Sequence, residues 1–565
     1  MPAHDVLIIG AGLAGQRAAL AAADEGASVA IMSKVHPVRS HSVAAAGGIN
    51  AALNPEDTWE SHAYDTVKGS DFLGDQDAIE VMCRAAPDEL LHLEHIGVTF
   101  HRNDKGELGT RAFGGASAAR TYYVADITGQ AILHVLYEQL LKYSDRVDRY
   151  EEWFTTSVIL DDEGTCVGCV ARDIRTGVME TFHAKNVILA SGGAGQCFKP
   201  TTNALICTGD GIAQAYRAGA PLMDMEMIQY HPTTLAENGF LITEGARGEG
   251  AHLLNADGER FMEKYAPNKM ELASRDVVSR AEQTEINEGR GVGEGGGGIA
   301  LDITVVPRKR TLEALREIVN IGKDFAGVDI TREPITIRPG QHYIMGGVKT
   351  DIDGRTSIPG LYAAGEVACV SVHGGNRLGA NSLLDTLIFG ARSGQHAAHR
   401  AAGIQMPNAG RARLHEDERM IEQIIARDHG GGRRVSEIKD ELGTVMNRHV
   451  AVFRDEAGLR EALEVVQRLK EEERTAYVDD RGTVFNQDVL GAIELGYMLD
   501  CAEAMLVAAI ERKESRGAQF RTDYPERDDD QWLKHIDISR NGDDVPDVFY
   551  SPVTITQWQP EERKY

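Results

Sequence analysis

The stretch Val6-Leu7-Ile8-Ile9-Gly10-Ala11-Gly12-Leu13-Ala14-Gly15 decides the fold of the first part of this 565-residue chain. Its four apolar residues predict a short buried strand, and the Ala-rich run over residues 16–24 predicts a helix. A strand, a glycine turn and a helix in this order place a pyrophosphate at the helix N-terminus, where free N–H groups and the helix dipole attract anions. The stretch therefore predicts a dinucleotide-binding α/β domain.

A run of small residues around one histidine follows the second expected strand, residues 28–32. That strand ends in Ser33-Lys34 instead of the usual acidic ribose ligand, although a serine hydroxyl can also bind a ribose. The run is Arg39-Ser40-His41-Ser42-Val43-Ala44-Ala45-Ala46-Gly47-Gly48-Ile49. Small side chains let the backbone approach a flat ring, so the run predicts a wall for an isoalloxazine with His41 at its edge. The alternative for this run alone is an Ala-rich helix start with a surface histidine.

The amino-acid composition argues against several kinds of partner and binding site. Lys and Arg number 59 against 86 Asp and Glu, a net charge of -27 that argues against nucleic acid or an anionic membrane surface as a direct partner. The 7 cysteines are scattered, as in a protein of a reducing compartment. Cys166 and Cys169 have C-x-x-C spacing but lack a second pair, so we expect a structural role and no metal site.

Neither end of the chain suggests a membrane anchor. The first strand begins by Val6, which leaves no room for a leader peptide, so we expect a chain that stays in the cytoplasm. The most apolar late window, residues 498–510, contains Asp500 and Glu503 and is shorter than a membrane helix requires. We therefore expect no direct membrane insertion.

The order of the expected elements suggests four parts. Residues 59–97 have helical spacing with breaks near 69–75, residues 111–129 form a polar glycine-rich loop, and residues 153–182 alternate like antiparallel strands. A strand and turn over residues 360–366 resume the nucleotide-binding pattern only after residue 341, so the part between is an insertion that could act as a lid. The expected parts are a discontinuous Rossmann-like domain (1–227 and 343–405), an inserted α+β capping domain (228–342), a helical domain (406–515) and an irregular tail (516–565).

Five further runs carry polar residues suited to chemistry. Each could be structural by itself: His231 precedes a proline, and Arg275 beside Asp276 could form a simple ion pair. Arg377 stands in a glycine-rich run, where a guanidinium can meet a planar carboxylate without crowding. The runs are Gln229-Tyr230-His231-Pro232-Thr233, Thr243-Glu244-Gly245-Ala246-Arg247-Gly248-Glu249-Gly250, Ser274-Arg275-Asp276-Val277-Val278, His342-Tyr343-Ile344-Met345-Gly346-Gly347 and His373-Gly374-Gly375-Asn376-Arg377-Leu378-Gly379-Ala380-Asn381-Ser382-Leu383-Leu384-Asp385.

Together with the small-residue wall, these runs resemble the flavoprotein subunits of succinate dehydrogenase and fumarate reductase, over nearly the whole chain. The resemblance implies that His41 is bonded covalently to FAD. It implies that His231, Thr243, His342 and Arg377 hold the two carboxylates of succinate or fumarate. It also implies FAD contacts from Gly10, Ala11, Gly12, Ala14, Gly15, Ser33, Lys34, Ser40, His41, Ser42, Gly47, Gly48, Asp210, Glu366, Ser382 and Leu383. For Asp210, a helix N-cap is the alternative.

Proton transfer is expected, by the same resemblance, from Arg275 through Glu244 and Arg247. An arginine conflicts with this role by its pKa above about 12, unless neighbouring cations and burial lower that pKa. His231 or His342 is the second choice, because imidazole is the ordinary acid or base near neutral pH.

The resemblance implies a succinate dehydrogenase that passes electrons to an iron–sulfur subunit. Membrane-anchor subunits would then hold the complex at the cytoplasmic face of the cell membrane. The alternatives are a fumarate reductase running the reverse reaction, L-aspartate oxidase, which holds its flavin without a covalent bond, and a non-catalytic flavin-binding scaffold. The chain departs from the family pattern at Ala46, usually glutamine or glutamate, and at Ala116, usually glutamine.

Overall fold

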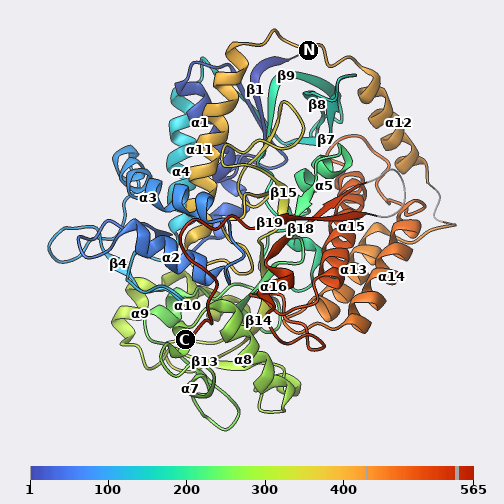
Figure 1. The fold of residues 1–565 in the computed structure, drawn as a ribbon. Helices are drawn as coiled ribbons and strands as arrows, with labels where there is room; N and C mark the ends of the chain where they lie inside the picture. The colour runs from blue at the N-terminus through green and yellow to red at the C-terminus, as the bar shows by residue number, and fades with distance from the viewer. Residues whose placement is uncertain (1, 428–429, 541–545, 565) are drawn as a thin grey trace.

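The computed structural model describes residues 2–427, 430–540 and 546–564, and its largest sheet follows the predicted nucleotide-binding pattern (Figure 1). Within those residues this sheet has seven strands, ordered β6-β2-β1-β9-β8-β7 with β16 beside β9. The central strands are parallel, whereas β7, β8 and β9 pair antiparallel. The strands are β1 (Ala3–Ile9), β2 (Val29–Ser33), β6 (Val147–Glu151), β7 (Trp153–Leu160), β8 (Cys166–Asp173), β9 (Met179–Leu189) and β16 (Leu361–Ala363).

Helices cover one face of this sheet. α1 (Leu13–Asp24) begins three residues earlier than expected, because Gly12 takes the N-cap position. It packs against α11 (Asn381–Ala402), and α4 (Thr128–Lys142) lies alongside (Figure 1). The helical pattern of residues 59–97 is confirmed as α2 (Trp59–Gly69) and α3 (Gln76–Ile96). The short strands β3 (Ile49–Asn50), β5 (Thr121–Tyr122) and β4 (Thr110–Arg111) form a small sheet, and β3 packs against α11.

The inserted segment forms its own antiparallel sheet, ordered β11-β14-β13-β12. An apolar cluster drawn from residues 235–337 lies between this sheet and its helices, as expected for a unit with a separate core. The 228–342 boundaries themselves stay a prediction. The elements are β11 (Ile228–Leu235), α6 (Gly245–Gly248), β12 (His252–Leu254), α7 (Met262–Tyr265), α8 (Arg275–Asn287), β13 (Ile299–Asp302), α9 (Arg308–Ala314), α10 (Arg316–Ala326) and β14 (Ile335–Ile344).

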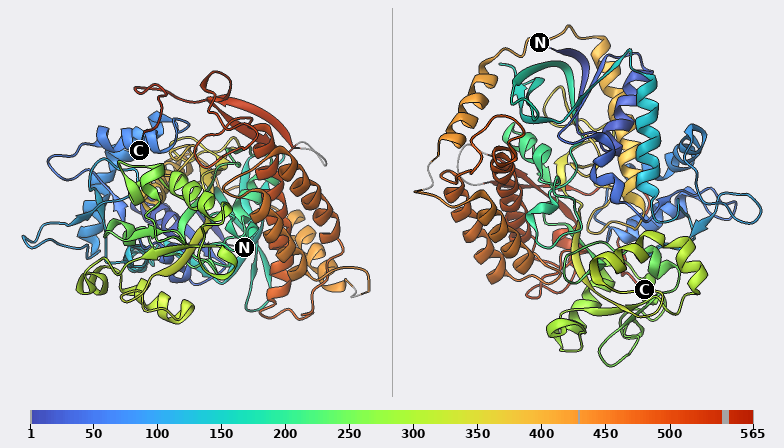
Figure 2. Two further views of the ribbon diagram at one scale, coloured as in Figure 1. Left: turned by 90° about the horizontal axis from the view of Figure 1, so that it is seen from below. Right: turned by 180° about the vertical axis from the view of Figure 1, so that it is seen from behind.

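Four helices follow in the part proposed as the helical domain: α12 (Ala412–Ala426), α13 (Val435–His449), α14 (Glu456–Glu473) and α15 (Gln487–Glu511). Figure 2 shows α13, α14 and α15 side by side against the flank of the molecule. α15 packs on α5 (Asp210–Arg217), whose Asp210 and Gln214 line the cavity described below. Residues 428–429 of this part lie outside the described residues. No helix of the described residues is long and apolar enough to cross a membrane.

The tail expected to be irregular is instead largely ordered. Its hairpin, β18 (Lys534–Ser539) and β19 (Asp547–Pro552), completes a sheet ordered β17-β15-β10-β18-β19. The other strands are β10 (Leu222–Met223), β15 (Gly347–Lys349) and β17 (Ala368–Cys369), and α16 (Asp529–Trp532) precedes the hairpin. The expectation was wrong because a long-range partner, β10, stabilises a segment whose local pattern is weak. Residues 541–545 and 565 of this part lie outside the described residues.

Candidate functional site

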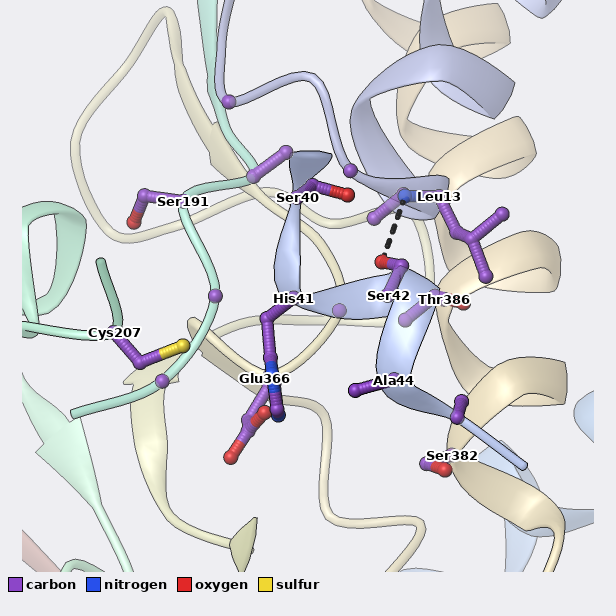
Figure 3. Close-up of a pocket in the computed structure, with 18 of the residues that line it drawn as sticks. Leu13, Ser40, His41, Ser42, Ala44, Ser191, Cys207, Glu366, Ser382 and Thr386 are labelled. Carbon is purple, nitrogen blue, oxygen red and sulfur yellow. Dashed lines mark hydrogen bonds between the residues drawn. The ribbon is translucent and has the colours of Figure 1, made fainter. Parts of the chain in front are cut away.

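One large cavity opens where parallel strands of the main sheet end, beside the inserted sheet. Ile9, Ser33, Ala190 and Ala364 line it, each at or directly after the carboxyl end of its strand, as ligand sites of open α/β sheets do. Figure 3 shows its lining drawn from segments far apart in the sequence, including the residues after β1, the His41 segment and the start of α11. Residues of the inserted segment line the other end of the cavity.

The glycines of the turn after β1 let neighbouring backbone segments approach one another closely. Gly10 has a φ of +111°, and a Cβ there would lie 2.2 Å from the Ala190 carbonyl oxygen. A Cβ on Gly15 would lie 1.9 Å from the Gly10 oxygen, so Gly15 serves the packing of the turn and does not line the cavity. Gly12 caps α1 without a side chain, and the buried Ser40 hydroxyl has no hydrogen-bond partner among the described residues. Such donors at a helix N-terminus fit a pyrophosphate.

His41 enters the cavity from a single turn of 3-10 helix, η2 (His41–Ala44). In Figure 3 it points away from Ser42, whose hydroxyl accepts a hydrogen bond from Leu13 N at 3.2 Å. The Ala204 N–H donates to His41 Nδ1 at 3.3 Å, and burial lowers the pKa of His41 to about 4. His41 is therefore a neutral imidazole at neutral pH. The structure thus favours the flavin-wall interpretation over a surface histidine.

Lys34 and Asp210 also line the cavity, where they meet in a largely buried cluster. The Lys34 Nζ donates to Asp210 Oδ2 at 2.7 Å, to Glu494 Oε1 at 2.6 Å and to Thr208 Oγ1 at 2.8 Å. Burial opposes the charged form, but Asp210 and Glu494 outweigh it and raise the pKa of Lys34. Asp210 begins α5 after the N-cap Gly209, so its side chain is not the cap. Glu494, from α15, was not predicted, because nothing in its local sequence points to a distant lysine.

Two histidines from neighbouring strands of the inserted sheet line the other end. His231 on β11 and His342 on β14 have ring centroids 4.9 Å apart. The Thr202 hydroxyl lies 2.8 Å from His342 Nδ1, and Thr233 N donates to His231 Nδ1 at 3.2 Å. Burial and then the Arg275 charge hold the pKa of both histidines well below the usual value. Both are neutral hydrogen-bonding groups near pH 7.

Arg377 is a buried cation with an unused donor. Its side chain stacks over the Tyr343 ring at 4.5 Å, and its Nε has no hydrogen-bond partner among the described residues. Burial, reinforced by the Arg275 charge, lowers the pKa of Arg377 to about 9. Gln229 Nε2 donates to the Arg377 carbonyl at 2.8 Å and so fixes this loop. Thr243, buried beside them, also lines the cavity.

Arg275, Glu244 and Arg247 form one buried chain of charges. Arg275 Nε donates to Glu244 Oε2 at 2.7 Å, and its Nη1 donates to Gln229 Oε1 at 3.0 Å. Arg247 Nη2 lies 3.6 Å from the same Glu244 oxygen. Burial would raise the pKa of Glu244, but Arg275 and Arg247 hold it below its usual range, and burial lowers the pKa of Arg275. Arg275 does not pair with Asp276, which binds Arg280 and Arg563 instead.

The cavity brings together all the predicted site residues except Gly15 and Arg247. Arg247 lies behind Glu244, outside the cavity lining, and the proposed relay through it stays a prediction. Three residues that were not predicted as site residues contact Arg275, His342 and Arg377: Gln229, Thr202 and Tyr343, respectively. Gln229 and Tyr343 stand inside the quoted runs, so their position beside the predicted residues was the available signal. Glu366 also lines the cavity, where burial raises its pKa to about 7.

The two departures from the family pattern occupy different places. Ala46 lines the cavity, and its carbonyl accepts a hydrogen bond from Arg111 Nη2 at 2.9 Å. Ala116 is not among the cavity residues, and its N–H donates to the Phe113 carbonyl at 3.3 Å. Of the two, only the change at Ala46 can act directly on a ligand.

Two family profiles together match most of the chain. The profile of the FAD binding domain matches residues 5–383, and that of the fumarate reductase flavoprotein C-terminal region matches residues 439–565. A fumarate reductase flavoprotein subunit from Mycobacterium tuberculosis is 44% identical and covers 100% of this chain and 99% of its own. A succinate dehydrogenase flavoprotein subunit from Rickettsia conorii is 45% identical over 98% of this chain and 95% of its own. The solved E. coli quinol fumarate reductase flavoprotein superposes with a TM-score of 0.96 at 38% identity, covering 100% of this chain and 99% of that one.

The matches extend over the cavity, the inserted segment and the C-terminal part alike. The predicted resemblance and the predicted fold are therefore confirmed. The chain belongs to the FAD-dependent enzymes of the family formed by the flavoprotein subunits of succinate dehydrogenase and fumarate reductase.

Proposed function

We propose that this chain interconverts succinate and fumarate, with succinate oxidation as its main direction. The observation that carries the proposal is Arg377, a buried guanidinium with an unpartnered Nε, in the same cavity as His41. An unpaired buried cation is costly, and a bound carboxylate would satisfy it. The neutral rings of His231 and His342, with Thr243, offer hydrogen bonds to the same dianion.

These residues would bind the substrate and orient it. Charge-assisted hydrogen bonds to a carboxylate contribute roughly 1.5–3 kcal/mol each, and holding both ends of a four-carbon diacid leaves its central carbons one orientation. Bound FAD supplies a two-electron acceptor for the hydride from one of these carbons. The glycine turn, Ser40 and the cluster of Lys34 and Asp210 are the groups that would hold this cofactor. Fixed geometry of this kind supplies much of a rate enhancement.

For the proton from the second carbon we propose Arg275, with Glu244 and Arg247 as the relay. Two of its donors are engaged by Glu244 and Gln229, and no partner for its Nη2 is present among the described residues. Burial lowers the pKa of Arg275, which eases the exchange of a proton. His231 and His342, whose pKa values are depressed, are poor acids and remain the second choice.

We further propose a covalent bond between His41 and the flavin. Because Nδ1 accepts from the Ala204 N–H, the neutral ring carries its proton on Nε2, and Nε2 would give up this proton as it bonds to the flavin. The bonded flavin carbon would lose a hydrogen in the same change, and the two electrons released would reduce the flavin itself, which its ordinary electron acceptor would reoxidise. Such a bond makes the flavin a better acceptor, which succinate needs because its methylene carbons are not activated. L-aspartate oxidase, the noncovalent relative, is then the less favoured alternative.

The relatives are named as flavoprotein subunits, which suggests that this chain also has partner subunits. We propose that electrons leave to an iron–sulfur subunit, and that membrane-anchor subunits hold the complex at the cytoplasmic face of the cell membrane. This chain would attach peripherally, through them.

The test uses the purified FAD-loaded protein. Acid-denatured protein run on a gel should keep flavin fluorescence in the polypeptide band. Succinate-dependent reduction of an artificial acceptor should exceed fumarate-dependent oxidation of a reduced viologen, and malonate should compete with succinate. Oxidation of L-aspartate with free flavin at the gel front would overturn the proposal. A faster fumarate rate would instead identify a fumarate reductase.

A further inference from the structure

The segment 553–564 connects two parts of the molecule that share the cavity. Its first half is fastened to the start of α3: Thr554 N donates to Asp75 Oδ1 at 2.6 Å, and Gln76 Nε2 donates to the Trp558 carbonyl at 2.6 Å. The Gln76 Oε1 accepts in turn from the backbone of residues 556–558. In Figure 1 the segment crosses from the hairpin, past α2, to the inserted part near α10 and β13.

Arg563, at the far end of this segment, joins two buried carboxylates. Its Nη2 lies 2.7 Å from Asp276 Oδ2 and 3.1 Å from Asp71 Oδ2, and its side chain is only 10% exposed. Asp71 follows α2, whereas Asp276 lies in the first turn of α8. Asp71 also binds Arg527 at 2.9 Å, and Asp276 also binds Arg280 at 2.9 Å. Without the shared guanidinium, the two carboxylates would repel each other across a buried contact.

The first turn of α8 also carries Arg275, directly before Asp276. Only Arg275 faces the cavity; its neighbour faces Arg563. The position of this turn therefore depends on Glu244 and Gln229 on one side and on Arg563 on the other. His231 and His342 lie on β11 and β14, Arg377 lies in the loop before α11 and Thr243 lies just before α6, so none of them stands on the turn of α8 that Arg563 contacts.

We propose that Arg563 is a positioning residue for proton transfer: by bridging Asp71 and Asp276 it holds the N-terminus of α8 so that Arg275 meets the substrate. The proposal rests on the proposed function, because it takes Arg275 as the proton-transfer group. Misplacement of a reacting group by about 1 Å can cost on the order of 100-fold in rate. Loss of the bridge should therefore slow the proton step more than it weakens substrate binding.

The test compares Arg563→Gln and Arg563→Lys with Lys564→Gln, all as FAD-loaded enzyme. Lys564 is the matched control, since it is a neighbouring cation that is 78% exposed and pairs only with Glu562 among the described residues. We expect Arg563→Gln to lower kcat about tenfold or more, with KM within about threefold and a larger solvent isotope effect on kcat. Arg563→Lys should recover part of kcat, because an ammonium can still reach one carboxylate.

Three outcomes separate a failure of the proposed function from a failure of the positioning role proposed for Arg563. Wild-type protein that turns over neither succinate nor fumarate overturns the proposed function itself. Active wild type with Arg563→Gln equal to Lys564→Gln in kcat and isotope effect overturns the positioning role alone. A loss of melting temperature and FAD content in Arg563→Gln that Arg563→Lys does not relieve, with an unchanged isotope effect, also overturns it and indicates a purely structural clamp.

Discussion

The charge state of His41 is a consequence of where its side chain lies. Burial alone lowers its pKa to about 4, so the ring stays neutral over the pH range of cells. A neutral ring nitrogen can form the proposed bond, whereas an imidazolium could not. The surrounding Ala44, Ala45 and Ala46 bring no group that would restore the charge.

His41→Ser tests the role of that bond. The variant should retain FAD, because the glycine turn and Lys34 are unchanged, but lose the fluorescent band on an acid-denatured gel. Succinate oxidation should be lost while some fumarate reduction remains, since each ~30 mV of flavin potential lost costs about tenfold in the equilibrium constant. Steady-state rates in both directions measure this. Undiminished succinate turnover would refute the role given to the bond.

Glu282 is a carboxyl group whose burial is not offset by hydrogen bonds from the described residues. Neither of its oxygens has a hydrogen-bond partner among the described residues, and its side chain on α8 is fully buried. Burial raises its pKa well above the usual value, and the Arg247 charge only partly opposes this. The folded protein therefore binds this proton more tightly than the unfolded chain. The corresponding stability is present below about pH 4.3 and is lost as pH rises through the folded pKa.

Glu282→Gln removes that dependence while keeping the shape of the neutral acid. At about pH 5 we expect the two proteins to melt at similar temperatures, and at about pH 8 the variant should melt higher. Thermal unfolding at the two pH values measures the difference. The same gap in melting temperature at both values would show that Glu282 does not titrate in this way.

At the scale of elements, α1 and α11 hold the nucleotide end of the cavity by direct backbone contact. A Cβ on Gly394 of α11 would lie 2.2 Å from the Ala18 carbonyl, and one on Gly390 would lie 2.6 Å from the Ala14 carbonyl. Only glycine allows this separation. The position of the α1 N-terminus, and with it the pyrophosphate site, depends on this contact.

Gly394→Val should therefore push α11 from α1. Overpacking of this kind costs about 1–3 kcal/mol, and the purified protein should carry less FAD. Gly403→Val is the control, because a Cβ there meets only the Arg400 carbonyl, at 3.8 Å. The flavin-to-protein absorbance ratio and the melting temperature report both effects. Equal FAD content in the two variants would contradict the argument.

α15 illustrates a second rule at this scale. Most of its 25 residues are buried. A helix that is apolar on all faces belongs in the interior, and this one lies between α14 and α5. Its charged residues are paired where they face inward: Glu494 with Lys34, and Asp500 with Arg217.

At the scale of the whole molecule, His535 joins three segments that lie far apart in the sequence. Its Nδ1 lies 2.7 Å from Asp224 Oδ2 and its Nε2 lies 3.3 Å from Asp75 Oδ1. Burial would lower its pKa, but Asp224 and then Asp75 raise it to about 10. The imidazolium thus ties the hairpin β18–β19 to β10 and to the start of α3.

His535→Gln should be destabilising near neutral pH, by about 3 kcal/mol, because the buried Asp224 and the half-buried Asp75 lose a charged partner, and only the more distant Arg512, at 3.8 Å, remains beside Asp224. The raised pKa means that the wild-type contribution is complete below about pH 6.5 and is lost as pH rises through about 10. The difference in melting temperature between the two proteins should therefore shrink from about pH 7 to pH 10. A constant difference would contradict the assignment of a charged His535.

The strands and helices around the nucleotide site were predictable because their signals are local: apolar runs, glycine turns and helical spacing within a few residues. The cavity residues could be predicted for a different reason, since their motifs match a family. The hairpin β18–β19 could not be predicted, because its stability comes from β10, more than 300 positions earlier.

The sequence by itself determined the α/β class, the dinucleotide turn and the residue types that could hold a flavin and a diacid. Tertiary structure alone decided which of them meet: Arg275 with Glu244 and not Asp276, Lys34 with Glu494, Asp276 with Arg563. The physical reason is the distance along the chain over which each kind of interaction acts. Backbone geometry and periodicity act between neighbours, whereas the partner and the charge state of a buried ion depend on the groups that folding brings around it.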